Sequence, residues 1–98
     1  MSKIQRLWRE HQAAPLPAGF LGREIEGVDI ISVDSHAAGC ISTFIGSSGR
    51  LDPERLFILK GCRDALARVL PALDGESKAY VERLHRLTVL VLAALKQR

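Results

Sequence analysis

The stretch GVDIISVDSHAAGCISTFIGSSG, residues 27–49, decides the fold class of this chain. Its first part is rich in β-branched residues, which favour an extended strand. Its second part has apolar residues at the spacing of one helix face, namely Ala37, Cys40, Ile41, Phe44 and Ile45. We predict a strand over residues 28–33, a cap at Asp34 or Ser35 and a helix over residues 34–46. The alternative is a second hairpin, with CISTFI as its return strand.

The segment before residue 34 predicts a β-hairpin over residues 20–33. Two β-prone runs, residues 21–25 and 28–33, flank Glu26 and Gly27. Glycine tolerates the positive φ that a tight hairpin turn needs. Because two strands alone are marginally stable in water, this hairpin must pack against helices.

Helices are predicted on both sides of this segment. An amphipathic helix over residues 1–14 ends before Pro15 and Pro17, which cannot continue it. Asp52 followed by proline is a strong helix start, and Asp74-Gly75 separates two long helical segments. The short turn predicts an antiparallel helical hairpin over residues 52–96. The expected fold is therefore an α+β, mainly α, single domain over residues 1–98.

Composition and charge exclude several classes of protein. A chain of 98 residues is one domain, and its 47% hydrophobic content argues against disorder. The net charge of +3 is concentrated after residue 49, but acidic residues are interspersed, which predicts a solvated helical face and makes nucleic-acid binding unlikely. The longest apolar run, residues 87–95, is too short to span a bilayer, and the N-terminus lacks an apolar leader. We expect a cytoplasmic protein with no membrane insertion.

His36 and Cys40 are the weak candidates for chemistry. They stand four residues apart, so a helix places them on one face, where they could bind zinc or activate the thiol. The paired ligand spacings of zinc sites are missing, and Cys40 repeats with the apolar residues. We therefore expect Cys40 and Cys62 to be free core residues, with no metal, no cofactor and no catalytic residues.

A small polar loop follows the predicted middle helix and is a possible binding loop. It comprises Gly46, Ser47, Ser48, Gly49 and Arg50. It lacks the lysine of a phosphate-binding loop, so a plain connection between helices is the expected role.

The runs GVDIISVDSHAAGCISTFIG and LDPERLFILKGCRDALARVLPAL resemble a family of small uncharacterised bacterial proteins. In that family an extended GxD segment leads into an Asp-x-x-x-Ala-Gly-Cys helix. The similarity covers about residues 18–95. It implies a bacterial, soluble protein and a packing role for the small residues Ala38 and Gly39. It implies no activity, substrate or site residue.

The last helix is apolar on nearly every face between residues 87 and 95. Because a small domain has few elements to cover such a helix, we predict that one of its sides forms a protein interface. The expected interface residues are Val81, Leu84, Thr88, Val91, Leu92 and Leu95. We expect a non-enzymatic interaction or homodimerising domain, with a homodimer or another protein as the partner. The alternatives are a nucleic-acid-binding regulator that uses the basic C-terminal half, and a small enzyme or metal protein centred on His36 and Cys40.

Overall fold

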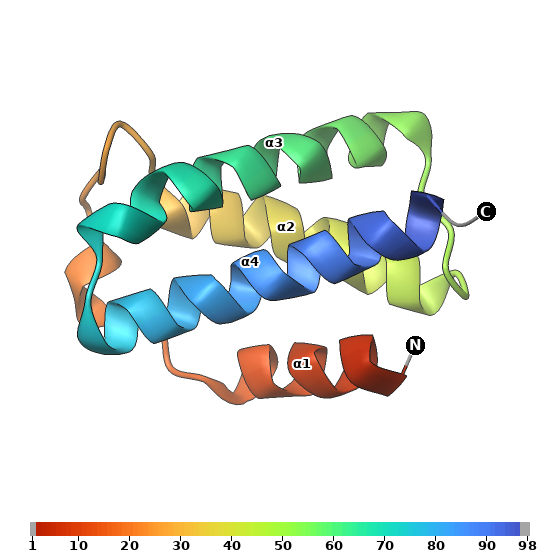
Figure 1. The fold of residues 1–98 in the computed structure, drawn as a ribbon, viewed down its shortest axis with the longest axis horizontal. Coiled ribbons are helices and arrows are strands. Elements are labelled where there is room, and N and C mark those ends of the chain that lie inside the picture. Colours follow the sequence, from red (N-terminus) through yellow and green to blue (C-terminus); the bar gives the residue numbers. More distant parts are fainter. Residues whose placement is uncertain (1, 97–98) are drawn as a thin grey trace.

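The computed structural model describes residues 2–96 and contains four α-helices. They are α1 (Ser2–Ala13), α2 (Ile30–Gly46), α3 (Pro53–Val69) and α4 (Gly75–Lys96). Two single-turn 3-10 helices, η1 (Ala18–Phe20) and η2 (Leu70–Ala72), lie in the connections. Figure 1 shows that α2, α3 and α4 run in alternating directions along the long axis of the molecule.

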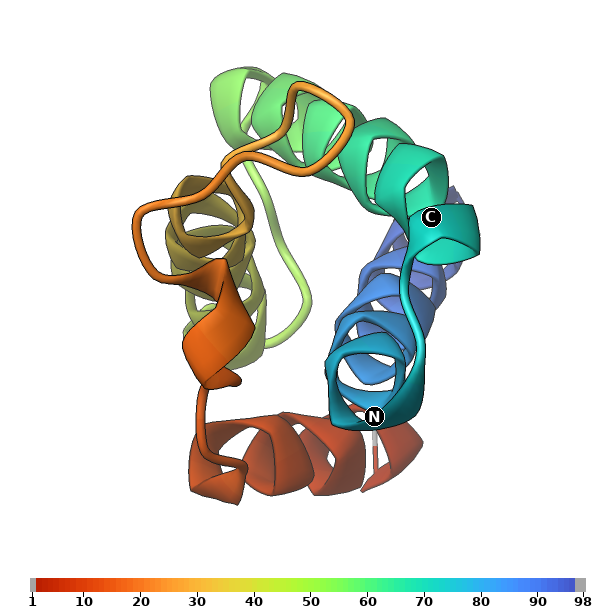
Figure 2. The ribbon, with the colours of Figure 1, turned by 90° about the vertical axis from the view of Figure 1, so that its left-hand side faces the viewer.

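The helices enclose one apolar core. Viewed along the bundle, α2, α3 and α4 form three sides, and α1 lies across the remaining side between α2 and α4 (Figure 2). The core is aliphatic apart from a few rings and includes residues from every helix and from η1. Phe20 in η1 and Phe44 in α2 are its largest fully buried side chains. The connection between α1 and α2 therefore takes part in the core.

The predicted α+β class is wrong, because residues 2–96 contain no strand or sheet. The tight turn of the predicted hairpin is present. Ile25 and Val28 exchange two backbone hydrogen bonds of 2.9 Å, and Glu26 and Gly27 both have positive φ, at 53° and 75°. The pairing ends at this single bridge, so no hairpin forms over residues 20–33.

A helix cap replaces the second predicted strand. Asp29 is the N-cap of α2, and its side chain accepts a hydrogen bond from the Ser32 backbone N–H at 3.3 Å. α2 therefore begins at Ile30, one turn before the predicted helix over residues 34–46, and neither Asp34 nor Ser35 is its cap. This early start buries Ile30 on the same face as Ala37 and Ile41. That burial outweighs the β propensity of the segment.

The C-terminal helical hairpin is confirmed together with its start signal. The Asp52 side chain accepts a hydrogen bond from the Arg55 backbone N–H at 3.2 Å, and Pro53 is the first residue of α3. Pro71 lies in η2, where the helix ends. α4 begins at Gly75, whose φ of 57° is the left-handed conformation that glycine adopts at little cost. Within residues 2–96, none of the helices combines the length and apolar character needed to cross a membrane.

Candidate functional site

An apolar groove bordered by basic residues lies between α3 and α4, near the C-terminal end of α4. Its volume is about 240 Å³. We call it the α3–α4 groove, and its lining consists of Leu56, Lys60, Arg63, Leu92, Leu95 and Lys96. Three leucines and three cationic residues thus share one surface depression.

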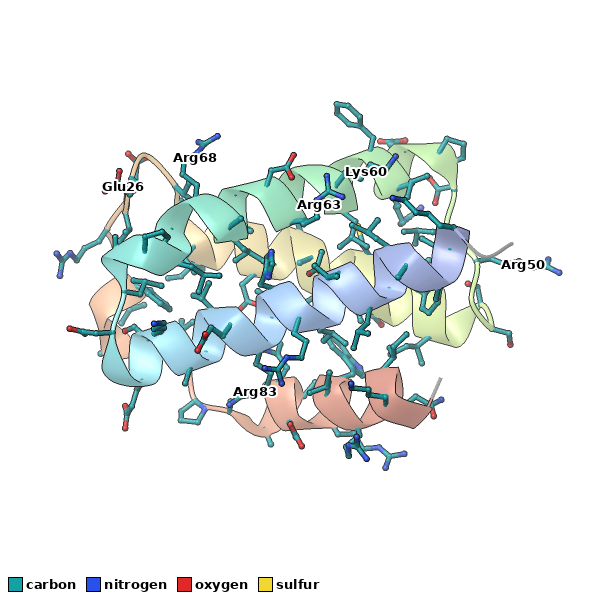
Figure 3. The ribbon with its side chains drawn as sticks, viewed as in Figure 1. Glu26, Arg50, Lys60, Arg63, Arg68 and Arg83 are labelled. Atoms are coloured by element: carbon teal, nitrogen blue, oxygen red, sulfur yellow. The ribbon has the colours of Figure 1, made fainter. Side chains whose placement is uncertain are left out.

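Helical spacing places these side chains in the groove. Leu56, Lys60 and Arg63 follow one face of α3 at i, i+4 and i+7, and the α4 residues follow at 92, 95 and 96. Leu92 is buried and forms the floor, whereas Lys60 and Lys96 are exposed. Figure 3 shows Lys60 and Arg63 along the same part of α3.

The charge around the groove is only partly balanced. The Arg63 Nε atom contacts the Asp64 carboxylate at 3.0 Å on the surface of α3. Lys60 and Lys96 form no ion pair within the part of the chain that the structure describes. The groove therefore presents a net positive rim around an apolar floor.

Phe57 is an exposed ring on α3, outside the residues that line this groove. Its side chain is 79% exposed, the highest value among the large apolar side chains of residues 2–96. It follows Leu56 in α3 and stands three residues before Lys60, so it neighbours Lys60 on the helix surface. Burying a phenylalanine that is otherwise exposed contributes about 1.5–3 kcal/mol. The ring is therefore an apolar group at the surface of α3 that a binding partner could bury.

A second constellation is polar and lies where α1, α2 and α4 meet. The His11 Nε2 atom is 2.8 Å from the Asp34 Oδ1 atom, and the Tyr80 hydroxyl donates to Asp34 Oδ2 at 2.5 Å. We call this the His11–Asp34–Tyr80 cluster. The His11 and Tyr80 ring centroids are 4.9 Å apart, and Trp8 stacks on His11 at 6.3 Å. The cluster joins three helices through one carboxylate.

The cluster is suited to holding helices together rather than to proton transfer. Burial raises the pKa of Asp34, but the hydrogen bonds from His11 and Tyr80 and the charge of His11 outweigh it, so the net pKa is lowered. Burial and the Asp34 carboxylate raise the pKa of Tyr80 well above its ordinary value. Asp34 therefore stays ionised as the acceptor and Tyr80 stays protonated as the donor. With Nε2 donating to Asp34, His11 Nδ1 has no partner in the described chain.

The structure does not bring His36 and Cys40 together as a reactive pair. His36 is exposed, whereas Cys40 is buried and its thiol contacts the Arg55 carbonyl oxygen at 3.6 Å. Burial raises the pKa of Cys40, the opposite of what a nucleophilic thiol requires. Residues 2–96 hold no group of three or more His, Cys, Asp or Glu side chains placed to bind a metal ion.

The two thiols are packed separately between α2 and α3. Cys62 contacts the Val33 carbonyl oxygen at 3.8 Å, and burial raises the pKa of its thiol to about 11. Because Cys40 contacts residue 55 and Cys62 contacts residue 33, the antiparallel helices place the two thiols two turns apart along the pair. Both cysteines are free and buried.

The predicted binding loop, residues 46–50, closes the end of α2 with its own hydrogen bonds. The Gly49 backbone N–H donates to the Phe44 carbonyl at 2.8 Å, with Gly49 at a φ of 95°. The Arg50 backbone N–H donates to the Ser47 hydroxyl at 3.1 Å. These bonds resemble a helix C-terminal motif and leave the Arg50 side chain exposed at the end of the molecule (Figure 3).

The predicted interface residues lie mostly inside the fold. Val81, Leu84, Thr88 and Val91 are fully buried by the other helices of the same chain. The Thr88 hydroxyl donates to the Leu84 carbonyl at 2.9 Å, so its polar group is satisfied internally. Only the last two members of the set, Leu92 and Leu95, line a surface depression, and this is the α3–α4 groove.

Sequence reasoning missed parts of both constellations. Lys60 and Arg63 were expected on a solvated helical face. Phe57 and Lys96 belong to no sequence pattern that would identify them as binding residues. Asp34 was expected to be a helix cap, because its partners stand 23 and 46 residues away. His11 on the apolar face of the first helix was the one available signal, since a buried histidine needs a polar partner.

Comparison with known proteins gives no match, either to a family model, to a curated protein or to a solved structure. The candidate sites therefore depend on their own geometry alone.

Proposed function

We propose that this protein is a non-enzymatic interaction domain that docks an acidic amphipathic helix of a partner protein in the α3–α4 groove. The observation that carries the proposal is the apolar floor of Leu56, Leu92 and Leu95 between three cationic side chains. A helix docks in a groove by placing its apolar face inside and its polar flanks at the rim. Here the rim selects carboxylates.

The size of the groove fits a short helical ligand. From residue 56 to residue 63, α3 advances by about 10 Å, which is two helical turns. A partner helix would contact the leucines with residues at i, i+3, i+4 and i+7. Its Asp or Glu residues would face Lys60, Arg63 and Lys96, and Phe57 would cover one edge. Charge complementarity of this kind raises the association rate and selects the partner.

A second copy of the chain is a poorer occupant of this groove. A two-fold dimer places the same patch of each subunit against its copy. The cationic rim would then oppose the cationic rim of the other subunit, which disfavours association. The remaining predicted interface residues are enclosed by the chain itself. These points favour a different, acidic partner over the homodimer.

The alternative functions have weaker support. The cationic residues Arg50, Arg68 and Arg83 lie on different parts of the molecule in Figure 3, whereas a nucleic-acid site needs a continuous basic stripe. An enzyme centred on Cys40 would need a thiol of lowered pKa, and burial raises it.

A designed peptide tests the proposal. The probe is a fluorescent amphipathic helix of about four turns, with leucine at i, i+3, i+4 and i+7 and glutamate on both flanks, measured by anisotropy. The control peptide has lysine in place of every glutamate. We expect saturable binding of the acidic peptide only, weakened about tenfold or more by Lys60→Glu, because charge reversal at the rim opposes the carboxylates.

The matched control variant is Arg68→Glu. Arg68 is an exposed cation of the same helix outside the groove, so its reversal changes the net charge equally but leaves acidic-peptide binding within about twofold. Equal binding of both peptides, or equal loss in both variants, contradicts the proposal. Displacement of the peptide by duplex DNA at low salt would instead favour the nucleic-acid alternative.

A further inference from the structure

The outward side of α3 carries one exposed aromatic ring among charged side chains of both signs. Phe57, Gly61 and Arg68 stand at i, i+4 and i+11, so they follow one stripe along the helix. Figure 3 shows Arg68 pointing away from the other helices. We call this exposed surface the outer α3 face, and it consists of Glu54, Phe57, Lys60, Gly61, Asp64 and Arg68.

Two features of the outer α3 face have no role inside the fold. The Phe57 side chain is 79% exposed, so the core does not use it. Gly61 lies in the middle of α3, where glycine destabilises a helix relative to alanine. A Cβ atom added at Gly61 would lie more than 4 Å from every packing neighbour in the described chain, so none of them requires a glycine there. An exposed ring near a position without a side chain suits close contact with another helix.

The charges of the outer α3 face alternate in sign along the helix and sum to zero. Glu54, Lys60 and Arg68 form no ion pair within residues 2–96, and Asp64 contacts Arg63, its neighbour in the sequence, at 3.0 Å. A partner that carries charges of one sign gains no net attraction from such a face. The complement of this face has the opposite sign at each position, and the same face turned end for end meets that condition.

We propose that the outer α3 face binds the same face of a second copy of this chain, with the two α3 helices antiparallel about a two-fold axis at Gly61. Residues at equal distances before and after Gly61 then lie opposite each other. Glu54 faces Arg68 of the second copy, because these residues stand seven positions before and seven positions after Gly61. Lys60 lies within about 3 Å, measured along the helix axis, of Asp64 of the second copy. The two-fold axis repeats both opposite-charge pairs.

The apolar part of this contact is centred on Phe57. Because Phe57 stands four residues before Gly61, its ring lies opposite residue 65 of the second copy. Residues 61, 64, 65 and 68 of one helix form the kind of hole that receives a side chain of a facing helix. Gly61 leaves room for the ring, and the Arg68 guanidinium stacks favourably on an aromatic face. A parallel pair of helices would instead place each charge against its own copy, which disfavours it.

This contact differs from a dimer through the α3–α4 groove, in which the cationic rims would oppose each other. It does not depend on the function proposed for that groove. Lys60 borders both surfaces and Phe57 would contact either occupant, so a second copy and a docked helix would compete for them. Because one pair of helix faces about 21 Å long is a small interface, the dimer should be weak, and peptide titrations in dilute protein should measure the monomer.

Two charge-reversed variants test this arrangement, and neither changes a residue that lines the groove. Glu54→Arg and Arg68→Glu each bring like charges together in a dimer of identical chains, whereas an equimolar mixture of the two variants restores both opposite-charge pairs. Sedimentation equilibrium of the whole chain at low salt, from about 10 µM to about 1 mM, measures the dissociation constant. We expect the unmodified chain to dimerise, each variant to weaken the dimer by about tenfold or more, and the mixture to recover to within about threefold.

The matched controls are Glu82→Arg and Arg86→Glu, exposed charge reversals on α4 that should leave the dissociation constant within about twofold. Gly61→Gln should weaken the dimer by about tenfold or more, because its side chain occupies the closest approach of the two helices. Urea denaturation should show no loss of stability in this variant, since glutamine favours a helix more than glycine does. A chain that stays monomeric at the highest concentration would overturn the proposal. So would a dimer that both charge variants leave intact, or a mixture that associates no more tightly than its two components.

Discussion

Helices α1 and α3 both pack against α4, but the two contacts differ in how polar groups are used. On the α1 side, one carboxylate receives hydrogen bonds from two other helices, in the His11–Asp34–Tyr80 cluster. On the α3 side, Lys60 and Lys96 form no ion pair within residues 2–96 and lie next to buried and half-buried leucines of the groove. In the first arrangement the polar side chains hydrogen-bond to one another within the fold. In the second, the charged side chains remain available to a partner at the surface.

This difference suggests that the polar groups on the α1 side stabilise the fold, whereas those on the α3 side bind a partner. A carboxylate enclosed with its donors stabilises the fold, because losing it leaves those donors unsatisfied. Exposed cations beside an apolar groove contribute little to stability, since surface charges are screened by water and salt. Substitutions on the α1 side should therefore affect unfolding, and substitutions on the α3 side should affect binding.

Among substitutions of polar groups, the largest effect on stability is expected from Asp34→Ala. The substitution leaves the Tyr80 hydroxyl and His11 Nε2 without their acceptor, so we expect a loss of about 2–3 kcal/mol in the free energy of unfolding. Urea denaturation measures it. The control is Asp64→Ala, which removes an exposed carboxylate of α3 and should cost less than about 0.5 kcal/mol. Similar losses in both variants would remove the distinction between the two sides.

Tyr80→Phe should have a smaller effect of the same kind. It deletes one hydroxyl and keeps the ring against His11 and Phe20, so the expected loss is about 1 kcal/mol. Because the hydrogen bond from Tyr80 helps to lower the pKa of Asp34, that pKa should rise in the variant. Urea denaturation and carboxyl NMR titration measure the two quantities. An unchanged Asp34 pKa would show that the hydroxyl does not stabilise the carboxylate.

Acid should weaken the unmodified protein through the same cluster. The pKa of Asp34 in the folded protein lies below its ordinary value of 3.8, so the ionised carboxylate stabilises the fold at higher pH. That contribution is present above about pH 4 and is lost as the pH falls through the lower folded value. Protonated Asp34 can still hydrogen-bond, so the loss should be smaller than in Asp34→Ala. In Asp34→Asn the acid dependence should flatten, although exposed Asp52, whose pKa is also lowered, keeps part of it.

The same contrast explains what could be predicted from the sequence. Local signals placed the C-terminal helices, since Asp52 and Pro53 start α3 and Gly75 starts α4 in the structure. The turn at Glu26 and Gly27 is also a local feature and is present. Residues 30–33 were predicted wrongly because their β-branched side chains favour a strand locally, whereas the core requires Ile30 on a helix face.

The sites depended on contacts that a local pattern does not carry. Asp34 looks like a cap next to a helix, and only the packing of α1 and α4 brings its two donors to it. Apolarity of the last helix predicted an interface, but packing against α1, α2 and α3 covers most of that set and leaves only Leu92 and Leu95 at a groove. The open face of α3, with Phe57 and Lys60, is determined by which sides the other helices cover.

The smallest effect on stability is expected from Phe57→Ala, although Phe57 is a large apolar residue. Its ring is exposed in the folded chain, so its removal costs little, and we expect a change within about 0.5 kcal/mol in urea denaturation. Phe44→Ala, which empties a site enclosed by the core, should cost about 3–5 kcal/mol. If Phe57 belongs to the docking surface, its removal should nevertheless weaken binding of the acidic peptide by about tenfold, the equivalent of about 1.4 kcal/mol. A variant that loses stability but keeps its affinity would assign Phe57 to the fold, and the division between the α1 and α3 sides would then fail at the most exposed large apolar residue of the α3 side.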